Sequence, residues 1–135
     1  MKIEKFTFNP FAENTYVIYD EGSKDCIIID PGCYEPNEEK ILLNFILSNK
    51  LVPSKLINTH CHIDHVFGNN FVMKNWNIKL FTHEKEQELL SQSQNIAKSY
   101  GFENYKISPK ADKFIDENDN ISIGGEKLKI FFTPG

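Results

Sequence analysis

Hydrophobic positions along the chain follow two periods, one of two residues and one of three to four. Short alternating or wholly apolar runs that end at Gly, Pro, Asn or Asp predict β-strands. Strands are expected at residues 2–8, 14–20, 26–29, 55–58 and 78–81, with a hairpin of residues 121–123 and 127–132. Residues 9–13 are expected to form a turn, and Pro53 to precede the strand at 55–58. The run Cys26-Ile27-Ile28-Ile29 lacks alternation, so both faces of that strand should be covered.

The longer period predicts helices between these strands. Residues 37–49 carry one apolar stripe that should dock on the sheet. The stripe consists of Ile41, Leu42, Phe45 and Ile46. Asn37 is expected as the N-cap, with acidic residues after it at the positive end of the helix dipole. Further helices are expected at residues 67–76 and 83–90. Strands that alternate with helices predict an α/β fold, and residues 1–135 suffice for one domain.

The segment Thr59-His60-Cys61-His62-Ile63-Asp64-His65 holds the strongest candidate for chemistry. Three of the four histidines lie here beside a carboxylate, and imidazole nitrogens and carboxylate oxygens are usual ligands of a zinc-like ion. A surface cluster or a helix-capping loop would need no metal. So tight a cluster in a chain otherwise poor in histidine favours a metal site.

The spacing within this segment suggests how the ligands divide. Side chains at i and i+2 of an extended segment point the same way, so His60 and His62 can reach one ion. If a helix begins directly afterwards, Asp64 and His65 can reach a second ion. The intervening Cys61 should then point into the protein, as should Ile63.

The run Thr59-His60-x-His62-x-Asp64-His65-x-x-Gly68-Asn69 resembles the signature of the metallo-β-lactamase fold superfamily. Its Gly-Asn extension is most similar to the hydroxyacylglutathione hydrolase, or glyoxalase II-like, branch. Residues 14–19, 29–32 and 133–135 also resemble strands and turns of that family. The resemblance implies an αββα sandwich, of which this chain would form the N-terminal αβ half: a mixed sheet with flanking helices.

The resemblance also implies an activity for the intact protein. It would be a hydrolase of a thioester or similar acyl compound that uses two metal ions, zinc with iron or manganese as alternatives. His60 and His62 would hold the first ion, and Asp64 and His65 the second. Asp64 would also act in catalysis by orienting the hydroxide. Two competing hypotheses remain. One is a redox enzyme that uses iron in the same fold, and the other is a non-catalytic module that works through an exposed sheet face.

The family pattern continues Thr-Pro-Gly-His, whereas this chain ends at Gly135. The remaining ligands of the family would therefore lie beyond it, and we expect the domain to be truncated at its C-terminus. Catalytic zinc sites commonly use three protein ligands for each ion, and this chain offers two. We therefore expect it to bind metal weakly and to be inactive alone. A sheet face left bare by the absent half should favour a homo-oligomer.

Several residues outside the cluster allow two interpretations. Asp30 is either a turn residue before Pro31 or, by resemblance, a carboxylate that holds the ligands in place. His83 could be a spare ligand, although a capping or surface role is favoured. Aromatic residues between 91 and 110 could form a lid over the site or pack in the ordinary way.

Composition narrows the remaining possibilities. A net charge of −4 gives no reason to expect nucleic acid or an anionic membrane as a partner, and no stretch has the length and apolarity of a membrane span. The charged N-terminus lacks the apolar core of a signal peptide. Cys26, Cys33 and Cys61 are odd in number and scattered, which is typical of free thiols in a cytoplasmic protein.

Overall fold

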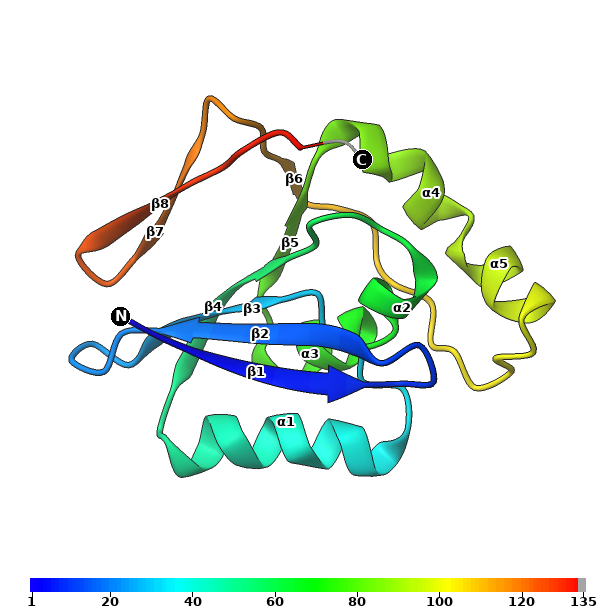
Figure 1. Ribbon diagram of the computed structural model, residues 1–135, viewed down its shortest axis with the longest axis horizontal. Helices are drawn as coiled ribbons and strands as arrows, with labels where there is room; N and C mark the ends of the chain where they lie inside the picture. Colours follow the sequence, from blue (N-terminus) through cyan, green and yellow to red (C-terminus); the bar gives the residue numbers. More distant parts are fainter. Residues whose placement is uncertain (134–135) are drawn as a thin grey trace.

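A six-stranded mixed sheet lies at the centre of the computed structural model, which describes residues 1–133 (Figure 1). Its strands follow one another in chain order across the sheet. They are β1 (Lys2–Phe8), β2 (Glu13–Tyr19), β3 (Asp25–Ile29), β4 (Val52–Ile57), β5 (Lys79–Thr82) and β6 (Lys113–Phe114). The first three strands pair antiparallel. From β3 to β6 the pairing is parallel, so these strands all end at the same edge. The expected α/β class, with a mixed sheet and flanking helices, is confirmed.

The helices lie in the connections between the strands. They are α1 (Pro36–Ser48), α2 (Ile63–Val66), α3 (Asn69–Trp76), the 3₁₀ turn η1 (Glu84–Glu86), α4 (Gln87–Ser91) and α5 (Ser93–Ser99). A separate hairpin of β7 (Asn120–Ile123) and β8 (Glu126–Lys129) follows β6. No helix among residues 1–133 is long and apolar enough to cross a bilayer.

The two faces of the sheet carry separate hydrophobic clusters. One face packs Ile28 and Leu56 against Leu42 of α1 and Val72 of α3, all fully buried. On the other face, Ile27 and Ile57 pack against the β7–β8 hairpin. Both faces of β3 are therefore covered, as its unbroken apolar run predicts.

The second face is only partly covered. The hairpin buries its middle, but Ile18, Ile29 and Phe81 at its margins remain partly exposed, and Ile3 on β1 is 63% exposed. The expectation of a bare face is therefore wrong at the centre, where the hairpin of this same chain supplies the cover. Self-association through the margins stays a prediction.

Element boundaries differ from the sequence-based expectation where local bonding decides them. Asn37 is not the N-cap of α1: the cap is Glu35, followed by Pro36, a residue that suits the first helical position. The Glu38 carboxylate accepts hydrogen bonds from the backbone N–H groups of Tyr34 (2.9 Å) and Glu35 (3.2 Å). These bonds satisfy N–H groups at and just before the cap, and they fix the start of the helix two residues before Asn37.

Three other boundaries also shift. Strand β4 begins at Val52 and includes Pro53, at a point where its register against β3 is irregular and a missing N–H is tolerated. The expected helix at 67–76 is preceded by the separate short helix α2, and α3 itself begins at Asn69. Strand β8 ends at Lys129 instead of residue 132. Pro134 and Gly135 of the terminal motif lie outside the described residues.

All three cysteines are free, as expected, and all three are buried. Burial raises the pKa of Cys26 to about 12 and that of Cys61 to about 12, and it also raises the pKa of Cys33. Because the thiolate is the reactive form, we predict that a chromogenic disulfide reagent labels none of them at pH 8 in the folded protein. Three thiols should react in denaturing urea. Rapid reaction of one equivalent without urea would contradict this packing.

Candidate metal centre

The candidate ligands lie where the parallel strands end. Asp30 follows β3, and the segment from Asn58 to His65 follows β4. His83 and η1 follow β5 at the same edge. The carboxyl ends of parallel strands meet at one edge of a sheet, which is where α/β proteins place their ligand sites.

The histidines of the cluster lie close together. The ring centroids of His60 and His62 are 4.8 Å apart with perpendicular planes, and those of His60 and His65 are 4.0 Å apart. The alternate positions Cys61 and Ile63 are buried, as the extended spacing predicts. The segment therefore presents imidazoles on one side and apolar side chains on the other.

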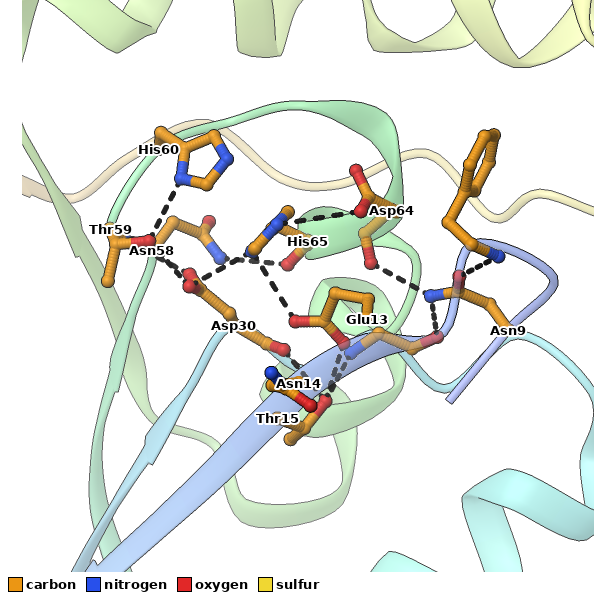
Figure 2. Close-up of polar contacts among 12 residues, drawn as sticks. Asn9, Glu13, Asn14, Thr15, Asp30, Asn58, Thr59, His60, Asp64 and His65 are labelled. Atoms are coloured by element: carbon orange, nitrogen blue, oxygen red, sulfur yellow. Dashed lines mark hydrogen bonds and ion pairs between the residues drawn. The ribbon is translucent and has the colours of Figure 1, made fainter. Parts of the chain in front are cut away.

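Asp64 and His65 form a second pair at the start of α2. The Nε2 atom of His65 lies 3.5 Å from Oδ2 of Asp64, and both side chains are about one-fifth exposed (Figure 2). Two ligands placed about 2.1 Å from one tetrahedral ion are separated by about 3.4 Å. The separation of these two atoms therefore suits two ligands of one metal ion.

Asp30 holds the ligand segment against the end of β3. Its carboxylate, only 3% exposed as a residue, accepts hydrogen bonds from the backbone N–H of Thr59 at 2.7 Å and from the Thr59 hydroxyl. Its Oδ2 also lies 3.0 Å from Nδ1 of His65 (Figure 2). The backbone φ of Asp30 is +50°, a strained value for this residue that neighbouring contacts must maintain. These contacts support the interpretation of Asp30 as a carboxylate that holds ligands in place.

The surroundings shift the two inner imidazoles in opposite directions. Burial, aided by the neighbouring His65, lowers the pKa of His60. Burial acts to lower the pKa of His65 as well, but the hydrogen bond and negative charge of Asp30 outweigh it, so the pKa of His65 is raised. His60 is thus kept neutral, the form in which an imidazole binds metal.

Glu13 is a component of the site that the pattern did not reveal. It was expected in a turn, but it is the first residue of β2 and only 4% exposed. Its Oε1 lies 3.4 Å from Nδ1 of His65 (Figure 2). Burial raises the pKa of Glu13 to about 9 against the lowering effect of the Thr15 hydroxyl, with a further rise from Asp30. The alternation Glu13, Thr15, Val17 on the buried face of β2 was the available signal.

A pair of buried amides supports the other side of the segment. Asn69 donates a hydrogen bond to Oδ1 of Asn58 at 2.8 Å, and Asn58 donates one to the carbonyl oxygen of His65 at 3.2 Å. Asn69 also donates to the hydroxyl of Ser108 at 2.9 Å. The end of β4, the start of α3 and the turn of α2 are therefore joined beneath the ligands.

Comparison with known proteins decides the family. The family model described as the metallo-beta-lactamase superfamily matches residues 8–135. The chain belongs to the metallo-beta-lactamase superfamily. It is 27% identical to the "Probable metallo-hydrolase YqgX" of Bacillus subtilis and 24% identical to a "Hydroxyacylglutathione hydrolase" of Prochlorococcus marinus.

These alignments cover most of this chain but only part of each relative. The match to YqgX spans all of this chain and 61% of the relative, and the match to the Prochlorococcus protein spans 85% and 38%. Among solved structures, the BLEG-1 B3 metallo-beta-lactamase matches 99% of this chain and 62% of its own, with a TM-score of 0.82 at 24% identity. TTHA1623, solved in a di-iron-bound form, matches 87% and 56% with a TM-score of 0.74 at 24% identity. The fold is thus the N-terminal half of the metallo-beta-lactamase fold.

The donor set fits the metal ions of a metallo-beta-lactamase superfamily protein. Asp30, His60 and His65 each offer a ligand atom within 4.8 Å of the others, and Asp64 faces His65 from the opposite side. Imidazole and carboxylate donors suit zinc and iron alike. Proteins of the superfamily bind metal ions, and this chain holds a candidate site for them whose donors do not distinguish zinc from iron.

His83 lies outside this donor set. Its Nδ1 accepts a hydrogen bond from the backbone N–H of Lys85 at 3.1 Å, which makes it the N-cap of η1. The nearby Glu86 accepts a hydrogen bond from the backbone N–H of Cys61 at 2.8 Å. The expected capping role of His83 is confirmed, and η1 contributes to the site through Glu86.

The aromatic segment after α5 is mainly packing. Phe102 and Tyr105 both contact Phe67 beside α2, and the Tyr105 hydroxyl lies 2.9 Å from that of Ser93. Tyr100 is the exception, being 62% exposed against Phe11 of the β1–β2 turn. Ordinary packing therefore accounts for Phe102 and Tyr105, two of the three aromatic residues considered for a lid.

The contacts of Asp30 predict a stability effect that needs no metal. Asp30→Ala removes the acceptor of two Thr59 bonds in a mostly buried place, so the free energy of unfolding should fall by about 1–3 kcal/mol. Urea denaturation measures this loss. Asp116→Ala is the matched control, because Asp116 also accepts a backbone hydrogen bond but in an exposed turn. Equal losses in the two variants would contradict the role given to Asp30.

Proposed function

We propose that this chain is the N-terminal part of a metal-dependent hydrolase that acts on a thioester or similar acyl compound. The observation that carries the proposal is the convergence of three imidazoles and Asp64 at one sheet edge, over the buried carboxylate of Asp30. We assign His60 and His62 to one ion, and Asp64 and His65 to a second. Similarity to a hydroxyacylglutathione hydrolase supports the substrate class.

The residues divide the work of hydrolysis among them. A bound divalent ion would supply a nucleophile from water at neutral pH and would polarise a substrate carbonyl. His60 and His62 would then serve as neutral donors. Oδ2 of Asp64 lies 3.5 Å from Nε2 of His65, and this carboxylate would orient the attacking water. Asp30 keeps the ligand segment in position through Thr59.

The remaining ligands would come from the part of the relatives that this chain does not span. Catalytic zinc uses about three protein ligands per ion, and our assignment gives two to each. The segment after β8 returns to the turn that precedes α4 (Figure 1), where the ring of Phe132 stacks on His83 at 5.2 Å. Phe132 thus brings this segment beside η1, whose Glu86 contacts the ligand segment.

A second candidate keeps the site and changes the chemistry. The solved structure of TTHA1623 holds two iron ions, and an iron-dependent redox enzyme of the same fold is the competing hypothesis. Metal analysis of the complete protein purified without added metal separates the two candidates. Zinc in the purified protein would support the hydrolase proposal. Iron together with redox activity would overturn it.

Zinc titration of the 135-residue chain, followed by the NMR signals of the imidazoles, tests the assigned ligands. The signals of His60, His62 and His65 should shift together, with a dissociation constant weaker than micromolar because two ligands per ion are too few. His83 is an internal control that should not shift, because its Nδ1 caps η1. A response of His83 alone, or no response in the cluster, would overturn the assignment.

Hydrolysis of an acyl thioester by the complete protein tests the activity itself. Asp64→Asn should lower kcat by about 100-fold or more, the usual contribution of a group that directs proton transfer or the nucleophile. Asp112→Asn is the control, because the Asp112 carboxylate accepts a hydrogen bond from the backbone N–H of Leu80 at the opposite end of β5. This variant should keep kcat within about twofold of the wild type. Equal rates in the wild type and Asp64→Asn would rule out the role of Asp64.

A further inference from the structure

Glu13 carries a buried carboxyl that the proposed chemistry does not use. Its side chain is 0% exposed. Among residues 1–133, no hydrogen-bond partner meets its Oε1. The polar atom that this oxygen faces is Nδ1 of His65, 3.4 Å away (Figure 2). A fully buried polar atom without a partner is costly, so this orientation needs an explanation.

The surrounding chain is shaped to hold this carboxyl. The Thr15 hydroxyl lies 2.9 Å from Oε2 of Glu13, and the same hydroxyl accepts a hydrogen bond from the backbone N–H of Gly32. A Cβ atom at Gly32 would overlap Oε2 of Glu13 and would also crowd the Asn9 amide. Glycine at position 32 therefore leaves the room that the Glu13 side chain occupies.

The two nitrogens of the His65 ring face different partners. Nδ1 lies 3.0 Å from Oδ2 of Asp30 and 3.4 Å from Oε1 of Glu13, while Nε2 faces Oδ2 of Asp64. Oδ2 of Asp30 is also engaged by the Thr59 hydroxyl. Among residues 1–133, Nδ1 forms no aligned hydrogen bond with either carboxyl. The two acids, one on β2 and one directly after β3, therefore act on the proton of the ring through their proximity.

We propose that Glu13 is a positioning residue that acts with Asp30 to keep the proton of His65 on Nδ1 and to present Nε2 to a metal ion. The part of this inference that concerns metal binding rests on the proposed function, whereas the part that concerns the tautomer of His65 does not. Partners of the second nitrogen of a histidine ligand commonly contribute about 10- to 100-fold to metal affinity. The proposal depends on the length of the Glu13 side chain, which brings Oε1 to 3.4 Å from Nδ1 of His65.

Two variants distinguish the effect of the length of the Glu13 side chain from the effect of its carboxyl group. Glu13→Gln keeps the length of the side chain and an oxygen that can accept from Nδ1, while Glu13→Asp keeps the carboxyl but withdraws it by one methylene. Ile46→Val is the matched control, because it deletes one methylene from the core beside α1, away from the site. Each is compared with the wild-type 135-residue chain.

The first measurement is the tautomer of His65 in the metal-free protein, read from its ring ¹⁵N NMR shifts at a pH where the ring is neutral. The Nδ1–H form should dominate in the wild type, Glu13→Gln and Ile46→Val. Its fraction should fall in Glu13→Asp. An unchanged tautomer in Glu13→Asp, or an equal change in Glu13→Gln, would overturn the proposal.

The second measurement is zinc binding, followed by the same His65 signals. The dissociation constant should rise about tenfold or more in Glu13→Asp and stay within about twofold in the other variants. Equal zinc binding by all four proteins would overturn the role of Glu13 and leave the proposed function standing. If zinc binds none of them, the ligand assignment fails, and the tautomer alone decides whether Glu13 positions His65.

Discussion

The bond between Asp30 and Thr59 is the contact on which the site depends. Asp30 follows β3 and Thr59 comes shortly after β4, so the Asp30 carboxylate joins the ends of two adjacent parallel strands. The same carboxylate faces Nδ1 of His65 at the other end of the ligand segment. A segment that carries four donor side chains is thereby fixed at both ends by one buried acid. The strained φ of Asp30 is consistent with a residue whose side chain, not its backbone preference, sets its conformation.

Electrostatics gives the site a character that suits a cation. Burial lowers the pKa of His60 and raises that of Glu13, and in both cases it favours the neutral form. Asp64 and the Asp30 contacts provide negative charge around His65, whose pKa is raised. Imidazoles crowded within 4 to 5 Å of one another are poorly compatible with several protons, whereas a metal ion requires them unprotonated. Burial therefore favours the neutral form of His60, which is also the form that metal binding requires.

The local pattern predicted much of the fold because its signals are local. The unbroken apolar run at β3, the stripe of α1 and the short alternation of β1 each follow from the period of the element. Errors occurred where a hydrogen bond or a packing partner outside the periodic pattern decided the outcome. Glu38 moved the start of α1 by satisfying N–H groups before it. The hairpin, formed nearly 100 residues after β3, covered a face that the pattern left bare.

The sequence by itself predicted the candidate ligands and how they would divide between two ions, because the spacing of His60, His62, Asp64 and His65 suggests which side chains share a side of one short segment. Only the tertiary structure decided which polar groups contact these candidate ligands. Glu13, Asp30 and Asn58 come from separate strands, and no spacing along the chain predicts that three such groups converge on His65. Their convergence is a property of the sheet, because the parallel strands β3 and β4 end at the edge where the antiparallel strand β2 begins.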